Sequence, residues 1–262
     1  MARKSLGQHF LLDGNITDKI VRCAGDLKGI NVIEIGPGPG GLTRSLLASE
    51  AAHVYAVERD DRCVAALGEL NKAYPGRLTI IAEDALAYAL PEQVSAPRAI
   101  VANLPYNIGT RLLLDWLEDI ARLSSDSYIH LTLMFQKEVA MRLSAEPNTK
   151  DYGRLSVFTQ WLCDVEHCFD LPASAFTPPP KVASSVVKLT PLKQPRAKAD
   201  KKTLQTLLQS AFGQRRKMLR SSLSSLSPNI QDMLTGSGID PTRRAETLSV
   251  EEFCRLACNL ER

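Results

Sequence analysis

The sequence predicts an α/β fold, in which a mostly parallel β-sheet with an antiparallel edge pair is followed by a small all-α C-terminal domain. From about residue 16 to residue 190, short apolar runs alternate with helical patterns. Strands separated by helices are typical of a parallel sheet that helices cover on both faces. Pro191 and Pro195 end this alternation, and only helical patterns follow them. We therefore expect one domain over residues 1–192 and a second over residues 193–262.

The expected elements are short and regular. Five apolar runs are predicted to form the parallel strands: Asn31–Ile35, His53–Val57, Leu78–Ile81, Ala99–Ala102 and Ile129–Phe135. Helical patterns separate them over Leu42–Ser49, Arg62–Lys72 and Ile108–Arg122. Two later β-rich runs, Trp161–Phe169 and Ser184–Thr190, are expected to form the antiparallel edge pair. The helices of the second domain are expected at Lys202–Phe212, Arg215–Ser222, Asn229–Thr235 and Val250–Leu260.

The composition is that of an ordinary globular protein. The chain has 262 residues, of which 44% are hydrophobic and 23% are charged, and its formal net charge is +3. This mild basicity does not by itself identify a nucleic-acid binder. The six cysteines form no pair with zinc-site or redox spacing, so neither a metal site nor disulfide bonds are expected. Neither a signal peptide nor an apolar stretch long enough to span a bilayer is recognised, so a cytoplasmic protein without a membrane partner is expected.

A glycine-rich turn follows the first predicted strand. Gly36, Gly38 and Gly41 match the spacing of a dinucleotide-binding turn, and Glu58 ends the next strand. Glycines allow the backbone to approach a ligand closely, and a carboxylate at that place can bind two ribose hydroxyls. NAD and S-adenosylmethionine (SAM) both need these features. The turn alone therefore leaves both cofactors open.

Neighbouring residues favour SAM over NAD. Glu34, within the strand, would repel a pyrophosphate but attract a cationic ligand. Pro37 and Pro39 remove amide donors from a turn that a phosphate group would want rich in N–H groups. Asp84, after the third strand, could accept a hydrogen bond from an adenine amino group, or it could cap the next helical turn. The ligand-binding interpretation is preferred because Gly36 and Glu58 would line the same crevice.

The most specific motif is Asn103-Leu104-Pro105-Tyr106, at the end of the fourth predicted strand. An aromatic amine is a poor nucleophile because its lone pair is delocalised into the ring. The Asn103 side-chain oxygen and the Leu104 carbonyl can each accept one N–H of such an amine and localise that lone pair. Pro105 would fix the backbone, and Tyr106 offers a ring on which a flipped base can stack. The alternative is a strand–helix junction in which Asn103 is a cap and Tyr106 lies in the core.

Together these motifs resemble the KsgA-type ribosomal RNA adenine dimethyltransferases over essentially the whole chain. The resemblance implies a Rossmann-like, SAM-dependent methyltransferase that dimethylates two adjacent adenosines near the 3′ end of 16S rRNA in the small ribosomal subunit. It also implies a role in ribosome biogenesis and a monomeric state. Gly7-Gln8-His9-Phe10-Leu11 is similar to the family's opening motif, which places His9 and Leu11 at the SAM site, although the family commonly has Asn where His9 stands.

A later loop, Phe176–Val182, also resembles family sequence. Its proline run is extended, which could bring Phe176 onto the second face of the base and pair it with Tyr106 in a sandwich. The alternative is a core aromatic beneath a loop. After Val182 the family usually has an aspartate, and this chain has Ala183, so any interaction of that carboxylate is in doubt.

The tail contains a basic cluster, Gln214–Arg220. Its cations, Arg215, Arg216, Lys217 and Arg220, are expected to contact RNA phosphates without reading bases. Lys198–Lys202, upstream, is expected to be a solvated helix face. Two other functions stay open: adenine methylation in large-subunit RNA, as antibiotic-resistance enzymes perform it, and a non-catalytic ribosome-assembly or transcription factor that kept the fold. The basic helical tail argues against the first, and the intact glycine turn and Asn103–Tyr106 motif argue against the second.

Overall fold

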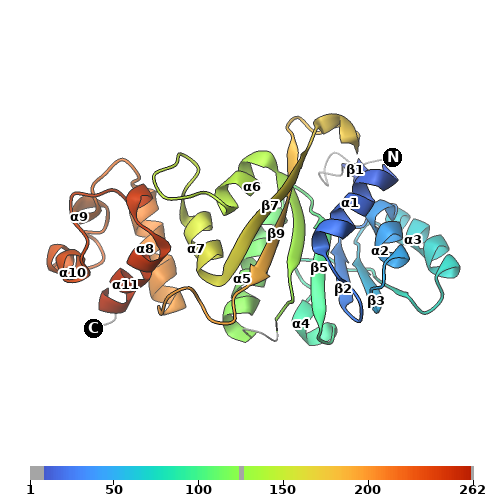
Figure 1. The fold of residues 1–262 in the computed structure, drawn as a ribbon, viewed down its shortest axis with the longest axis horizontal. Helices are drawn as coiled ribbons and strands as arrows, with labels where there is room; N and C mark the ends of the chain where they lie inside the picture. Colours follow the sequence, from blue (N-terminus) through green and yellow to red (C-terminus); the bar gives the residue numbers. More distant parts are fainter. Residues whose placement is uncertain (1–8, 124–126, 261–262) are drawn as a thin grey trace. The chain divides into compact units, whose positions relative to one another are not determined.

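A seven-stranded sheet with strand order β4-β3-β2-β5-β6-β9-β7 forms the frame of the protein (Figure 1). The computed structural model describes residues 9–123 and 127–260. The strands are β1 (Phe10–Leu11), β2 (Asn31–Ile35), β3 (His53–Val57), β4 (Leu78–Ile81), β5 (Arg98–Asn103), β6 (Leu131–Gln136), β7 (Cys163–Leu171), β8 (Phe176–Thr177) and β9 (Ser184–Pro191). The helices are α1 (Gly14–Ala24), α2 (Gly41–Ala48), α3 (Asp61–Ala73), α4 (Leu90–Gln93), α5 (Gly109–Leu123), α6 (Lys137–Leu143), α7 (Arg154–Leu162), α8 (Lys201–Gly213), α9 (Leu219–Ser222), α10 (Ile230–Gly236) and α11 (Val250–Leu260).

The pairing of the strands creates a crevice at one edge of the sheet. Strand β2 pairs in parallel with β3 on one side and with β5 on the other. After β2 the chain therefore moves outward to β3 and β4, and then returns across β2 to β5 and β6. In α/β sheets, ligands bind beyond the carboxyl ends of the strands where this reversal occurs. Here that place lies between the end of β2 and the end of β5.

The expected mostly parallel sheet with an antiparallel edge is confirmed. Strand β9 runs antiparallel to β6, and β7 completes that edge. A separate two-stranded ribbon pairs β1 with β8, with Leu11 opposite Phe176. This ribbon joins the start of the chain to the loop before β9.

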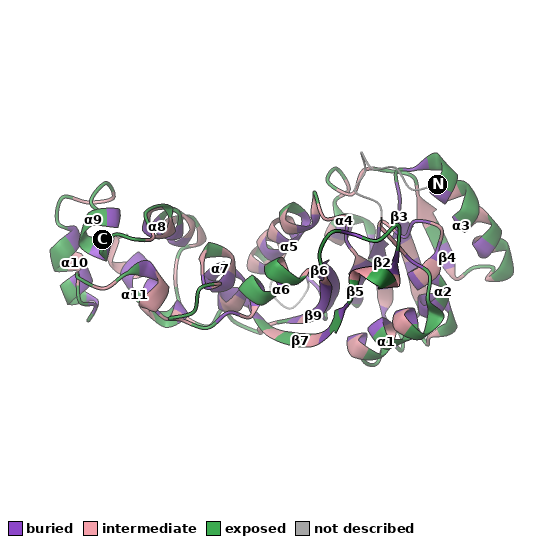
Figure 2. Ribbon diagram, turned by 90° about the horizontal axis from the view of Figure 1, so that it is seen from above, coloured by how far each residue is buried: buried purple, intermediate pink, exposed green. Residues whose placement is uncertain are grey.

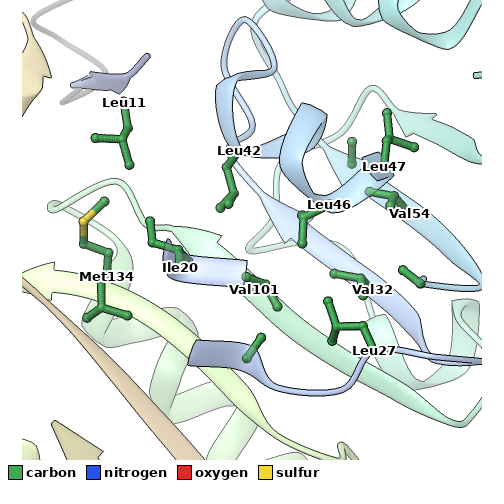
Figure 3. Packing of buried hydrophobic residues seen from close by; sticks show 14 of the residues in the cluster. Leu11, Ile20, Leu27, Val32, Leu42, Leu46, Leu47, Val54, Val101 and Met134 are labelled. Atoms are coloured by element: carbon green, nitrogen blue, oxygen red, sulfur yellow. The ribbon is translucent and has the colours of Figure 1, made fainter. Parts of the chain in front are cut away.

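The core between the sheet and its helices consists of branched aliphatic side chains. Val32, Val54 and Val101, from three adjacent strands, lie against Leu46 of α2 and Ile20 of α1 (Figure 3). Each is at most 2% exposed, and burying one such side chain contributes about 1.5–3 kcal/mol. Figure 2 shows α1 and α2 on one side of the sheet and α4 and α5 on the other. The sheet is therefore covered on both faces, as its uninterrupted apolar strands require.

Helix α5 shows how the pattern in the sequence produces this covering. Its buried residues recur at the three- and four-residue spacing of one helix face: Leu112, Leu113, Trp116, Leu117 and Ile120. The residues between them, Leu114, Asp115, Glu118 and Asp119, are less buried, and Asp115 forms an ion pair with Arg111 one turn earlier. The helix begins at Gly109, after only two residues beyond the Asn103–Tyr106 motif. Its packing therefore fixes the end of the loop that carries the motif.

The chain divides into two compact units. The first, called the sheet unit, comprises Met1–Ala140 and Glu166–Pro191, and the second, called the helical unit, comprises Met141–Val165 and Leu192–Arg262. The change at Pro191 lies next to the boundary expected after residue 192. Residues Met141–Val165 differ from that expectation, because they belong to the helical unit. The reason is aromatic packing, in which Tyr152 contacts Phe212 edge-on and Phe212 contacts Phe253.

Two of the expected elements are wrong in detail. Trp161 lies in the last turn of helix α7, which ends at Leu162, and strand β7 begins only at Cys163. Arg215–Lys217 forms a turn instead of the first turn of a helix, and α9 begins at Leu219. Within residues 9–123 and 127–260, no helix is long and apolar enough to cross a bilayer.

Candidate active site

A pocket lies at the crevice between β2 and β5. The empty space in it, counted with the open solvent at its mouth, is about 1040 Å³. Ten residues expected at a cofactor or adenine site line this one pocket: His9, Leu11, Gly36, Gly38, Glu58, Asp84, Asn103, Leu104, Pro105 and Tyr106. They come from four strand ends and from β1. The other two residues of the family's opening motif, Gly7 and Gln8, lie outside the described residues.

The glycine turn after β2 packs closely against strand β1. Gly36 and Gly38 have φ angles of 65° and 56°, in the left-handed region that favours glycine. A Cβ at Gly38 would lie 2.7 Å from the ring of Phe10, and one at Gly41 would lie 2.1 Å from the Leu11 carbonyl oxygen. These glycines are therefore required so that the segment at Phe10 and Leu11 can close over the turn and form one wall of the pocket.

The carboxylate of Glu58 holds the glycine turn. Its Oε2 accepts the Gly38 N–H at 3.1 Å, and its Oε1 accepts the Asp60 N–H at 2.8 Å. The residue is 6% exposed. Because each carboxylate oxygen has two lone pairs, both oxygens can still accept a hydroxyl from a ligand in the pocket. The geometry suits the expected ribose contact and adds a second role, which is to fix the turn itself.

Glu34 forms part of the pocket wall as a buried carboxyl group. It is 1% exposed, and its Oε2 accepts a hydrogen bond of 2.6 Å from the Thr43 hydroxyl. Burial raises the pKa of this carboxyl to about 8, against the opposing effect of the Thr43 bond, and the charge of Glu58 raises it further. Near neutral pH the group is therefore mostly protonated. A cationic ligand beside it would favour the charged form.

Asp84 lines the pocket and also caps a turn. Its Oδ1 accepts the Leu86 N–H at 3.0 Å, and its Oδ2 pairs with the Arg59 guanidinium at 2.7 Å. The ligand-binding and capping interpretations of the sequence are thus compatible. Arg59 is a pocket residue that the sequence reasoning missed. Its position directly after Glu58, at the carboxyl end of β3, is the signal that could have found it.

Asn103 is held in one orientation by the start of the chain. Its Nδ2 donates to the His9 carbonyl oxygen at 3.1 Å. The side-chain oxygen of Asn103 is thereby directed away from His9, where it can accept from a ligand. After Asn103, the Pro105 carbonyl accepts the N–H groups of Ile108 and Gly109 at 3.2 and 2.9 Å, which begins α5. The motif is therefore a fixed strand–helix junction that also lines the pocket.

The imidazole of His9 connects this junction with the later loop. Its Nδ1 lies 2.8 Å from the Pro178 carbonyl oxygen, so Nδ1 carries the proton, because a carbonyl only accepts. The same ring lies 5.4 Å from the Tyr106 ring at a tilt of 31°. Residues from three distant parts of the sequence thus meet around Tyr106.

Phe176 does not face the pocket. Its side chain is 3% exposed and belongs to the same apolar cluster as the residues of α1 and α2. Its strand β8 pairs with β1, which turns the ring inward beneath the ribbon. The expectation that Phe176 covers the second face of a base is therefore not met in this structure. The alternative, a core aromatic beneath a loop, describes the observed position.

The basic cluster lies in the helical unit, in the turn that follows α8 and at the start of α9. Arg216, Lys217 and Arg220 are exposed, and Arg215 donates from Nη2 to the Thr149 carbonyl oxygen at 3.1 Å. Arg215 thus contributes to the packing of the unit, whereas the other three direct their charges toward solvent.

Comparisons with known proteins agree with this geometry. The family model described as "Ribosomal RNA adenine dimethylase" matches residues 1–261. The chain is 53% identical over 261 residues to the "Ribosomal RNA small subunit methyltransferase A" of Ruegeria sp., covering 100% of this chain and 92% of that protein. It is 56% identical over 260 residues to the protein of the same name from Paramagnetospirillum magneticum, covering 99% and 90%.

Solved structures show the same fold. A dimethyladenosine transferase from Plasmodium falciparum is 26% identical, with a TM-score of 0.78, over 95% of this chain and 96% of the other. The 23S rRNA methyltransferase ErmE is also 26% identical, with a TM-score of 0.71, over 97% of this chain and 100% of the other. With a family model that spans the chain and relatives more than half identical to it, the protein belongs to the ribosomal RNA adenine dimethylase family.

Proposed function

We propose that this enzyme uses SAM to dimethylate the N6 amino groups of two adjacent adenosines near the 3′ end of 16S rRNA, in the small ribosomal subunit. The names of its relatives, at 53% and 56% identity, support the small subunit as the substrate. One observation carries the chemistry: the Asn103 amide is fixed by the His9 carbonyl so that its oxygen is left for an amine in the pocket. A cytoplasmic site of action and a role in ribosome biogenesis follow from that substrate.

The residues of the pocket fit SAM. Glu58 can accept the two ribose hydroxyls, Asp84 can accept from the adenine amino group, and the buried Glu34 suits a cationic methionine end. The positive φ angles at Gly36 and Gly38 bring the backbone close to the ligand without side-chain obstruction. When bound, SAM supplies an electrophilic methyl group on a sulfonium centre.

The chain's own contribution to methyl transfer is positioning. The Asn103 oxygen and the Leu104 carbonyl accept the two N–H groups of the target amine, which localises the nitrogen lone pair for an in-line displacement. Tyr106 offers its ring to the base, which has to leave its helical stack to reach the pocket. A strong base is not required, because the nitrogen becomes acidic once the methyl group has transferred. Phe176 is not assigned to this step.

RNA binding is proposed for the helical unit. Arg216 and Lys217, in the turn after α8, and Arg220, in the first turn of α9, are exposed cations that can contact phosphates. Such contacts position an RNA without reading its sequence. The choice of adenosine would then depend on the shape of the assembled subunit and on the pocket.

A second candidate is adenine methylation in large-subunit RNA. It is favoured by the likeness to ErmE, at a TM-score of 0.71 and 26% identity. The higher identities of the relatives named for the small subunit favour the first candidate.

The test is methyl transfer from radiolabelled SAM to undermethylated small subunits, with large subunits and naked RNA in parallel, followed by nucleoside analysis. The expected product is dimethyladenosine in the small subunit only. Asn103→Ala should abolish transfer while SAM binding remains measurable by calorimetry. Asn15→Ala, an exposed residue of α1, is the matched control and should behave as wild type. Label in the large subunit would support the second candidate, and near-normal transfer by Asn103→Ala would exclude the amine-binding role.

A further inference from the structure

The hydroxyl of Tyr106 is bound by a residue of strand β9, which lies two strands away from β5 in the sheet. The Tyr106 Oη and the Ser184 Oγ lie 2.5 Å apart. Ser184 is fully buried, and it begins strand β9, where it stands opposite Gln136 of β6. Tyr106 itself is only partly buried, since its ring lines the pocket. A buried strand residue thus holds the tip of an active-site ring.

The next residue in the strand has a different partner. Successive side chains of a strand point to opposite faces of the sheet. Accordingly, Ser185 donates to Asp170 Oδ1 at 2.7 Å, in a cluster that also contains Lys137 and His167. Ser184 and Ser185 are both buried serines, yet only Ser184 is bonded to the pocket ring. The chain therefore offers a matched pair for a test.

We propose that Ser184 is a positioning residue, which fixes the ring of Tyr106 in the orientation needed to stack on the target adenine. The inference rests on the proposed function. Three contacts fix the ring: the turn at Pro105 sets its backbone, the His9 ring lies beside it at 5.4 Å, and Ser184 holds its hydroxyl. Without the last contact the ring keeps its place in the chain but can rotate about its side-chain bonds.

The phenol stays in the form that this contact requires. Burial raises the pKa of Tyr106, and the bond from Ser184 opposes that rise only in part. Near neutral pH the Tyr106 side chain is therefore an uncharged hydroxyl, which can either donate to Ser184 or accept from it. The contact is thus present throughout the range in which the enzyme would work.

Ser184 should affect the methyl-transfer step and leave cofactor binding unchanged, because it contacts Tyr106 and is not among the residues that line the pocket. Removing one hydrogen bond of this kind corresponds to a loss of about 3- to 10-fold. We expect Ser184→Ala and Tyr106→Phe each to lower kcat by about that factor. The KM for the small subunit should stay within about twofold, since phosphate contacts dominate RNA affinity. SAM affinity should also stay within about twofold.

The double variant gives the decisive measurement. Since both substitutions remove the same bond, Ser184→Ala/Tyr106→Phe should be no slower than either single variant. Tyr106→Phe also removes the bond without creating a cavity at the buried Ser184, so it remains informative if Ser184→Ala folds poorly. Ser185→Ala is the control and should keep the wild-type kcat.

Three results would overturn the inference: multiplicative losses in the double variant, a loss of SAM affinity that equals the loss of kcat, or an equal loss of kcat in Ser185→Ala. The first would show independent roles, and the other two would show a general structural effect. Absence of transfer by the wild-type protein to any RNA would instead contradict the proposed function. The two failures are therefore distinguishable.

Discussion

The buried carboxyl of Glu34 should make the sheet unit less stable as the pH rises. Its pKa is about 8 in the folded protein, against an ordinary value of 4.5. Below about pH 4.5 the group is protonated in both states, so its burial carries no charge penalty. Between the two pKa values the unfolded chain ionises while the folded protein keeps its proton. The free energy of unfolding then falls by about 1.36 kcal/mol for each pH unit.

The expected magnitude follows from these two pKa values. From about pH 5 to about pH 8.5 the contribution of Glu34 to stability should fall by roughly 4 kcal/mol, and above that range it should change little. Glu34→Gln removes the titration but keeps an oxygen that can accept the Thr43 hydroxyl. The stability of the variant relative to wild type should therefore rise by roughly 4 kcal/mol over the same range.

The assay is guanidinium unfolding at several pH values, followed through the fluorescence of Trp116 in a Trp161→Phe background. Trp116 is buried in α5 of the sheet unit. His130 is also buried, and burial lowers its pKa to about 4, so it opposes the trend at acid pH in both proteins. The difference between the variant and its parent cancels this contribution. If the two stability profiles run parallel from about pH 5 to about pH 8.5, the buried-carboxyl reasoning is wrong.

Three further predictions concern the turn, the core and the RNA surface. Gly41→Ala would place a Cβ 2.1 Å from the Leu11 carbonyl oxygen. The substitution should therefore lower the free energy of unfolding of the sheet unit by about 1–3 kcal/mol in chemical denaturation. It should also weaken SAM binding in calorimetry. An unchanged SAM affinity would argue against closure of the Phe10–Leu11 segment over the turn. Phe176→Ala should lower the free energy of unfolding by about 3–5 kcal/mol, and it should reduce SAM affinity and methyl transfer together. A loss of methyl transfer alone would instead support the stacking role of Phe176. In a plot of the logarithm of the small-subunit binding constant against the logarithm of the salt concentration, Lys217→Ala should reduce the slope by about 1. Lys202→Ala, the control, should leave the slope unchanged. Equal slopes in the two variants would contradict a phosphate contact of Lys217.

Local patterns in the sequence were enough to predict most of the fold. Strands β2, β3 and β4 have the predicted bounds, because a short buried run between turn residues leaves little choice. Trp161 was misplaced because an apolar run can be a strand or the end of a buried helix. The assignment of Met141–Val165 to the helical unit depends on Tyr152 contacting a phenylalanine of α8, which no local pattern reveals.

The candidate site shows the same difference between what local patterns predict and what distant contacts decide. The sequence by itself was enough to predict residues that line one pocket, because the glycine turn, Glu58 and Asn103–Tyr106 each follow or end a recognisable strand, and parallel strands place those ends together. Only the tertiary structure decided how they are held. The His9 carbonyl orients Asn103 across 94 residues, Ser184 holds Tyr106 across 78, and the pairing of β1 with β8 turns Phe176 into the core. Such contacts depend on the order and register of strands distant in the chain, which no short-range pattern of side chains encodes.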